Sequence, residues 1–351
     1  MTTLAEVVDA VVGVDTHRDT HEAELATPNG MVLARVQINN DDAGFAQLLV
    51  WIGEHAPGPR VVVAVEGTRS YGIGVSRALI AAGLQVIECE QPTRRDRRGR
   101  GKSDAIDAHL AVLFALRQEA DRLPTPRADG LRDALRILLS ARQELVTTST
   151  AQVNRLRALL LGGDYHDRAI SRRSLTTAVL TTLARRRLPA DAQRHDAIRH
   201  QEIRRLALAI REAHVVLKAN RRDLQHIVDE LAPGLTDRSG VGPVTAAQVV
   251  VSFSHRGRVR NDAAFAALAG TSPLPASSGQ TVRHRLNRGG DRALNRSIHT
   301  IAMTRMRSCA RTHDYVMRRT AEGKSSREIR RILKRYITRE LYRTLNAAMT
   351  T

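Results

Sequence analysis

The chain has 351 residues, of which 42% are hydrophobic, so it can bury a substantial core and general disorder is excluded. Its 55 basic side chains outnumber 36 acidic ones, and the formal charge of +19 indicates a polyanionic partner, with nucleic acid as the leading candidate. The two cysteines form neither a disulfide framework nor a CxxC zinc pattern, and with no signal peptide apparent and no apolar run of about 18 residues we expect a cytoplasmic protein without a membrane partner.

The first 115 residues or so alternate between the apolar patterns of strands and of helices. A Pro-Asn-Gly turn at residues 28–30 lies between two strand patterns and predicts a hairpin. Strand and helix patterns alternate after it, which predicts a mixed sheet flanked by helices. The expected strands are residues 11–17, 22–28, 31–38, 60–66 and 84–90, and the expected helices are residues 42–56, residues 72–83 and a helix that begins after Ser103.

Residues 126–232 are expected to form a helical arm that follows a sheet domain at residues 1–125. Leucine and isoleucine recur at helical spacing in two stretches, from Leu131 to Leu159 and from Ile198 to Leu231. Two long helices paired as an antiparallel coiled coil are the simplest solution, with short helices or loops between them. We expect this arm to be an insertion or an oligomerisation element.

Residues 233–351 form the last expected domain, which is mainly helical. Gly-Val-Gly-Pro at residues 240–243 directly precedes a helix. Backbone amides at a helix N-terminus can bind a phosphate, so this turn is either a helix-hairpin-helix element that contacts nucleic acid or a plain turn and helix cap. An Arg-rich helical stretch closes the chain.

Four carboxylates follow apolar elements of the predicted sheet domain. Asp15 and Glu66 each close a strand, and Asp104 and Asp107 lie three residues apart at a helix start, so they share a face. A buried carboxylate is costly unless it is paired, and a shared divalent cation would remove that cost. Hard oxygen ligands suit Mg²⁺ or Mn²⁺, and such ions assist phosphodiester exchange. The pattern predicts a ribonuclease-H-like nuclease fold with a metal centre at these four acids.

Other residues near these acids have less specific interpretations. Any single acid after a strand can be a simple cap or turn residue, as we expect for Asp19. Glu90 also ends a strand and would replace Glu66 under a different strand order. Three histidines, His17, His21 and His109, could bond to the acids or be ordinary polar residues.

A basic run directly precedes the pair of aspartates. It is either a solvated loop or a clamp on nucleic acid, and its position beside the acids favours the clamp. Its members are Arg94, Arg95, Arg97, Arg98, Arg100 and Lys102.

Three blocks in this order resemble a known family. GVDTHRDTH, VAVEGT and KSDAIDAHL in the N-terminal part, with GVGPVTAAQVV and FAALAGTSPLPASSGQTVRHRLNRGGDRALNRSIH in the C-terminal part, are similar to DEDD-type insertion-sequence transposases, which share their N-terminal blocks with pilin-gene invertases. The resemblance implies a RuvC-like catalytic domain whose acids are Asp15, Glu66, Asp104 and Asp107. It also implies the coiled-coil arm and a mainly helical transposase domain, so the expected fold class is α/β plus α.

The resemblance further implies a nucleophilic serine in the segment Pro-Ala-Ser-Ser-Gly. We assign Ser278, with Ser277 as the alternative. Arg283, Arg285 and Arg288 follow and could hold phosphates. A serine needs activation, and its attack would store the bond energy in a phosphoserine link that can be resealed.

The implied function is a transposase that recombines donor and target DNA as a homodimer assembling to a tetramer, guided by a structured bridge RNA. Two alternatives stay open. The first is a hydrolytic RuvC-like nuclease such as a junction resolvase, without a serine step. The second is a nucleic-acid-binding protein with a degenerate centre, which the presence of all four acids disfavours.

Overall fold

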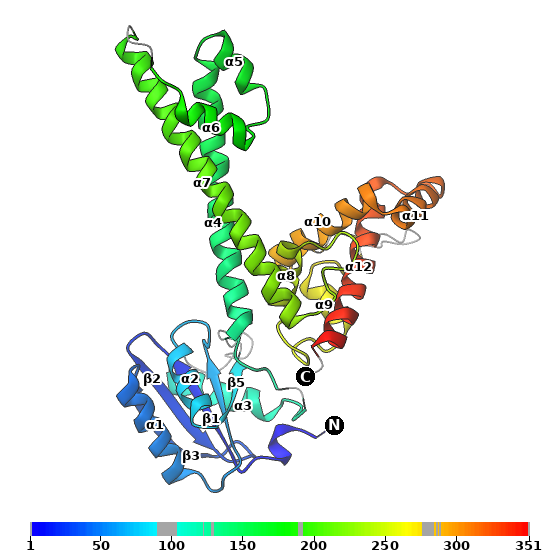
Figure 1. Ribbon diagram of the computed structural model, residues 1–351. Coiled ribbons are helices and arrows are strands. Elements are labelled where there is room, and N and C mark those ends of the chain that lie inside the picture. Colours follow the sequence, from blue (N-terminus) through cyan, green and yellow to red (C-terminus); the bar gives the residue numbers. More distant parts are fainter. Residues whose placement is uncertain are drawn as a thin grey trace.

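The computed structural model describes residues 2–89, 104–121, 123–127, 130–188, 192–275, 284–285, 287 and 289–349. The chain forms a sheet domain, a long helical arm and a group of C-terminal helices. The sheet domain and the C-terminal helices both lie at the lower end of the arm (Figure 1). Some of the predicted site residues lie outside the described residues: Glu90, the basic run from Arg94 to Lys102, Ser277, Ser278, Arg283 and Arg288.

The N-terminal part forms the expected mixed sheet. Its strands are β1 (Ala10–Thr16), β2 (Thr20–Ala26), β3 (Val32–Asn39), β4 (Val61–Glu66) and β5 (Gln85–Cys89), in the order β3-β2-β1-β4-β5. The hairpin strands β1, β2 and β3 pair antiparallel, whereas β4 and β5 pair parallel to β1 and to each other. The hairpin predicted from the Pro-Asn-Gly turn is confirmed.

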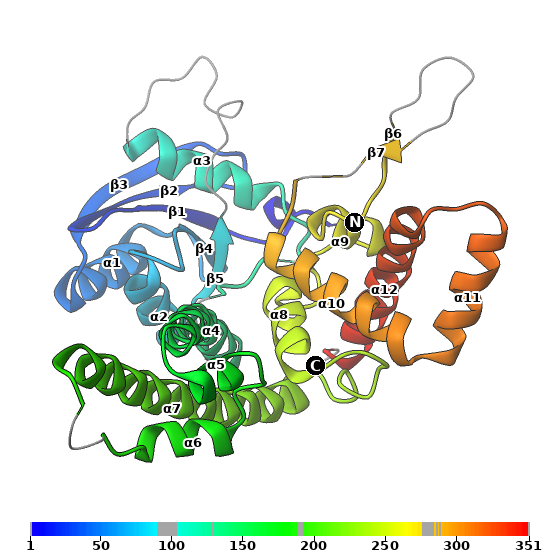
Figure 2. The ribbon, with the colours of Figure 1, turned by 90° about the horizontal axis from the view of Figure 1, so that it is seen from above.

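Helices cover both faces of this sheet (Figure 2). On one face lie α1 (Asp42–His55) and α2 (Ile73–Ala81), and on the other lies α3 (Asp104–Leu116), with the short 3-10 helix η1 (Leu4–Glu6) packed beside it. Side chains of β1 alternate between the two cores, since Val12 and Val14 pack on the first face and Val11 on the second. The strand is buried on both sides, which is why its sequence is almost uninterrupted apolar.

The arm consists of two long helices that run antiparallel. They are α4 (Gly130–Leu161) and α7 (Arg194–Leu231), joined at the far end by α5 (Tyr165–Ser171) and α6 (Thr177–Arg185). Asn220 of α7 donates to the carbonyl of Leu138 at 2.9 Å, and Arg142 donates to the side chain of Asn220 at 3.2 Å. Such a buried amide between apolar helices fixes their register. Supercoiling of the pair stays a prediction.

The remaining helices lie beside the base of the arm, where most of them share a third core. They are α8 (Pro243–Phe253), α9 (Asp262–Leu268), α10 (Arg292–Ser308), α11 (Ala310–Ala321) and α12 (Ser326–Ala348), and the strands β6 (Leu274–Pro275) and β7 (His284–Arg285) form a short antiparallel ribbon. Leu135 of α4 and Leu224 of α7 are fully buried in the same cluster as Val250 and Ile298. The arm is therefore anchored in the C-terminal core. None of the helices in the described ranges has the length and apolarity that a membrane span requires.

Candidate metal centre

Two of the predicted acids come from neighbouring parallel strands. Val14 of β1 is paired with Val65 of β4, so Asp15 and Glu66 follow at the same level of the sheet. Paired positions of adjacent strands present their side chains to the same face, and here it is the face that α3 covers. Asp15 is 5% exposed and Glu66 is 8% exposed. Two carboxylates thus lie beneath the start of α3.

Helix α3 brings the other two acids to this place. It crosses β1 at Gly13, where a Cβ atom would come within 2.1 Å of the carbonyl oxygen of Ala108. Only glycine permits this approach. Asp107, which precedes Ala108, is buried, whereas the side chain of Asp104, one turn earlier, is 57% exposed. The spacing of three residues places both aspartates in the first turn, as predicted.

A histidine joins the acids. The Nε2 atom of His17 lies 3.3 Å from Asp15 Oδ2 and 3.2 Å from Asp104 Oδ1. One ligand atom from each of these three residues lies within 4.8 Å of the others, a spacing at which they could hold a metal ion. His17 is therefore a candidate ligand beside the acids.

The electrostatics of the centre favour a bound cation. Burial raises the pKa of Asp15, the positive charge of a protonated His17 opposes that effect, and the negative charges of Asp107 and Asp104 add to it. A divalent ion would stabilise the ionised form of these clustered carboxylates. Oxygen donors with one imidazole are a donor set that hard and borderline divalent cations accept. The residues present therefore fit a divalent metal.

A further carboxylate flanks the same row. Glu22 is the register partner of Asp15 on the hairpin strand β2. Burial raises the pKa of Glu22, and the charges of Asp104, Asp15 and Glu24 also raise it, against the charge of Arg35. Five acids thus gather at this edge of the sheet.

Glu24 lies two residues further along β2, where it pairs with Gly13, and is fully buried. Its carboxylate is bound by His109 Nδ1 of α3 at 2.6 Å and by Arg35 Nη2 of β3 at 2.7 Å. The bond to His109 ties α3 to the hairpin strands. Of the three histidines that the sequence left open, His109 therefore supports the helix that carries Asp104 and Asp107.

Sequence reasoning predicted the four acids and left His17 open as a residue that could bond to them, but it did not propose Glu22 as a member of the cluster. The signal was the tight turn at Arg18 and Asp19, where the backbone N–H of His17 donates to the carbonyl of Thr20 at 3.0 Å. That turn fixes the register of β1 and β2 and pairs Asp15 with Glu22. Asp19 itself is exposed in this turn and bonds Arg18, as expected for a turn residue.

The predicted serine segment joins β6 to β7. The described ends of this segment pair as Leu274 with Arg285 and Pro275 with His284. Ser277 and Ser278 lie outside the described residues, and of the arginines predicted beside them only Arg285 has a described backbone. In Figure 2 the β6–β7 ribbon and α3 lie toward the same side of the molecule.

Two family profiles match this chain. A profile described as a DEDD transposase of the IS110 type matches residues 12–163, and one described as the IS116/IS110/IS902 transposase family matches residues 233–317. The first spans all four acids and the whole of α4, and the second spans α8 to most of α11. The two matches occur in the expected order and together cover about two thirds of the chain.

Individual proteins agree with the profiles. The chain is 27% identical to the 43.6 kDa protein of insertion element IS110 from Streptomyces coelicolor, over 91% of this chain and 90% of that protein. It is 30% identical to a mini-circle protein of the same organism, named as a candidate transposase for IS117, over 42% of this chain and 37% of that protein. It is 28% identical to a Sinorhizobium fredii protein, also named as a candidate transposase, over 61% of this chain and 53% of that protein.

Proposed function

This chain belongs to the IS110-type transposases, and we propose that it cuts and rejoins DNA at the centre formed by Asp15, Glu66, Asp104 and Asp107, through a phosphoserine link made by Ser278. The sheet domain then corresponds to a RuvC-like catalytic domain at residues 1–125. The arm at residues 126–232 connects it to a transposase domain at residues 233–351.

The observation that carries this proposal is the convergence of the acids beneath α3. Asp15, Glu66 and Asp107 are each less than 9% exposed, although each is a carboxylate. Burial disfavours the ionised form of a carboxylate, and a divalent cation shared by this cluster would stabilise that form, which supports a metal ligand there. Mg²⁺ or Mn²⁺ held by these oxygens would stabilise the charge that develops on a phosphate during strand transfer.

The serine step accounts for recombination rather than simple hydrolysis. The Ser278 hydroxyl gives up its proton, its oxygen bonds to phosphorus, and the P–O bond to the leaving sugar oxygen breaks as that oxygen takes up a proton. Reversal of the step with a new sugar hydroxyl rejoins the strand and frees the serine. Neither step needs an external energy source, because each phosphodiester bond is exchanged for another ester. Ser277 is the alternative nucleophile.

The proposed partners follow from the family and the charge. Donor and target DNA are the substrates, and a structured bridge RNA selects them, in the bacterial cytoplasm at the nucleoid. Because more than 160 residues and the arm separate Ser278 from Asp107, we propose that the serine of one subunit meets the acids of another in a homodimer that assembles to a tetramer. Arg94–Lys102, Arg283, Arg285 and Arg288 are the proposed phosphate contacts beside the centre.

A strand-cleavage assay on a plasmid that carries the element's ends tests this function. Asp15→Asn and Asp107→Asn should each lower cleavage by about 10³-fold or more, because a neutral amide holds a cation poorly. Asp19→Asn is the matched control, since Asp19 is an exposed acid four residues from Asp15. Ser278→Ala should abolish cleavage as well. Full cleavage by Ser278→Ala and Ser277→Ala would assign a hydrolytic nuclease instead.

A further inference from the structure

The C-terminal helices concentrate the positive charge of the chain. Residues 292–349 contain fifteen basic and four acidic side chains, so this segment contributes more than half of the net charge of +19. The second family profile ends at residue 317, within α11, and leaves α12 outside. Most of this charge therefore lies beyond the matched region.

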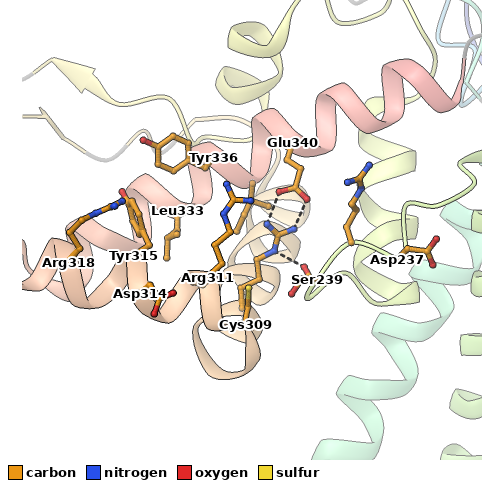
Figure 3. A pocket seen from close by; sticks show the side chains of 14 residues that line it. Asp237, Ser239, Cys309, Arg311, Asp314, Tyr315, Arg318, Leu333, Tyr336 and Glu340 are labelled. Atoms are coloured by element: carbon orange, nitrogen blue, oxygen red, sulfur yellow. Dashed lines mark hydrogen bonds and ion pairs between the residues drawn. The ribbon is translucent and has the colours of Figure 1, made fainter.

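A pocket opens among these helices. It has a volume of about 970 Å³ and lies between the end of α10, α11, α12 and the loop at residues 237–239. Figure 3 shows Arg311 and Tyr315 of α11 on one side of it and Tyr336 and Glu340 of α12 on the other. A recess of this size admits a ligand the size of a nucleotide, whereas a duplex backbone would contact a flat or convex surface.

The arginines of the pocket differ in their bonding. Arg305 bonds both oxygens of Glu340 at 2.8 and 2.9 Å, so it is a structural pair. Within the described ranges, neither Arg311 nor Arg318 lies within ion-pair distance of a carboxylate, and both residues are exposed. Two guanidinium groups at the pocket are thus available for a ligand phosphate.

Aromatic rings lie beside these guanidinium groups. Tyr336 is 49% exposed, and its ring meets that of Tyr315 edge to face at 6.0 Å. The guanidinium carbon of Arg318 lies 5.6 Å from the centre of the Tyr315 ring. The exposed ring of Tyr336 thus lies next to a ring that contacts a cation. Unpaired bases stack on exposed aromatic rings, because each base has a π face.

Two acids add hydrogen-bond acceptors to the pocket. Asp237 and Asp314 line it together with the arginines. Their carboxylates repel phosphates, but they accept hydrogen bonds from the amino groups of bases. In an unpaired nucleotide the pairing edge of the base is free, so the whole amino group can reach these acceptors.

We propose that this pocket binds an unpaired nucleotide segment, with Tyr336 stacking on a base and Arg311 and Arg318 holding the flanking phosphates. The ligand can be an unpaired part of an RNA or a single strand of DNA, since the chemistry is shared. The site is remote in sequence from the acids and independent of the cleavage step. Its place in the function is to hold one strand while the centre acts on another part of the nucleic acid.

Fluorescence anisotropy with the full chain, in the absence of divalent cations, tests the pocket. The probes are oligomers of about 12 nucleotides as unpaired RNA, unpaired DNA and DNA duplex. Tyr336→Ala should weaken binding of the tighter unpaired probe by about tenfold, and Tyr336→Phe should retain it, because stacking needs the ring alone. The tighter of the two unpaired probes identifies the source of the strand.

A comparison of two double variants that remove the same charge distinguishes binding in the pocket from general electrostatic attraction of nucleic acid. Arg311→Ala with Arg318→Ala should weaken binding of the unpaired probe by about tenfold more than Arg307→Ala with Arg343→Ala, two exposed arginines of α10 and α12 outside the pocket. All four arginines are exposed, so a thermal melt should confirm that both double variants stay folded. Equal losses in the two double variants, or an unchanged affinity in Tyr336→Ala, would overturn the proposal.

The cysteines provide an independent test. Cys309 lines the pocket and is partly exposed, while Cys89 is buried in the sheet domain. Alkylation by N-ethylmaleimide should therefore modify Cys309 first, and a bound unpaired probe should slow this reaction by about fivefold or more. Unchanged alkylation of Cys309 in the presence of saturating probe would contradict the assignment. The reaction does not involve cleavage, so it is unaffected by whether the proposed serine step is correct.

Discussion

The carbonyl oxygen of Ala108 lies where a side chain at Gly13 would be, at 2.1 Å from the position of a Cβ atom. This contact lets α3 rest directly on β1. Because Asp107 precedes Ala108 and Asp15 follows Gly13 by two residues, the same contact sets the distance between the helix acids and the strand acid. A packing relationship between two small residues thus determines the geometry of the metal centre.

Gly13→Ala should disrupt both packing and function. The added methyl group must displace backbone, which costs about 2–3 kcal/mol of stability and moves α3 away from Asp15. Urea unfolding and the cleavage assay measure the two effects. Gly53→Ala is the control, because Gly53 lies on α1 with nothing within 4 Å of its Cβ position, and alanine there should stabilise the helix by up to about 1 kcal/mol. Equal stability of the two variants would show that α3 does not depend on this contact.

His17→Ala should weaken the binding of the divalent metal without unfolding the protein. Its Nε2 atom is within 3.3 Å of two acids, so its loss should raise the Mg²⁺ or Mn²⁺ concentration needed for half-maximal cleavage by about 10-fold to 100-fold. His195→Ala removes an exposed histidine from the arm and should leave the titration unchanged. A normal metal titration for His17→Ala would exclude the histidine from the centre.

Glu24→Ala should destabilise the sheet domain. The carboxylate is fully buried and bonds His109 and Arg35, so its removal leaves two donors without their acceptor. We expect a loss of about 2–3 kcal/mol in the free energy of unfolding. This is less than the loss for a fully buried ion pair, because the side chain of Arg35 is half exposed. Asp19→Ala breaks a fully surface-exposed pair and should cost less than about 0.5 kcal/mol. Similar losses in both variants would mean that the Glu24 bonds do not hold α3.

The junction between the sheet domain and the C-terminal helices should loosen in acid. His255 follows α8, and its Nε2 atom accepts a hydrogen bond from the backbone N–H of Thr125 at 3.4 Å. Burial is the main cause that lowers the pKa of His255 to about 4; the charges of Arg132, Arg258 and Arg127 act in the same direction, and the charge of Glu88 opposes them. The neutral ring is the form that fits the junction.

The sign of the pH effect follows from this shift. The unfolded chain binds a proton at His255 near pH 6.5 and the folded chain only near pH 4, so stability is full above pH 6.5 and is lost as the pH falls from 6.5 to 4. Because the ring is partly exposed, we expect a loss of about 1–2 kcal/mol, measured by urea unfolding across this range. His255→Gln cannot be protonated and should reduce the loss by that amount. The same pH slope in both proteins would contradict the role of His255.

The sequence predicted the parts of the fold that depend on local patterns. Strand and helix periodicity located the mixed sheet, the two long helices and the helix after Gly-Val-Gly-Pro, each to within a few residues. The four acids could be chosen because each closes a strand or opens a helix. Glu22 was missed and the role of His17 stayed open, because their place depends on the register of the β1–β2 hairpin, which the sequence patterns did not determine. The proposed nucleotide pocket is lined by three helices and a loop that are distant in the sequence, and no local sequence pattern predicts that they pack together.

Identification of a covalent protein–DNA intermediate tests the central claim most directly. The full chain, with DNA bearing the element's ends and Mg²⁺, would be denatured during the reaction, digested with protease and nuclease, and analysed by mass spectrometry. The proposed reaction predicts a nucleotide attached to the peptide that contains Ser278, absent in Ser278→Ala and in Asp15→Asn. Efficient strand cleavage with no such adduct, or with an adduct on a different residue type, would contradict the phosphoserine reaction.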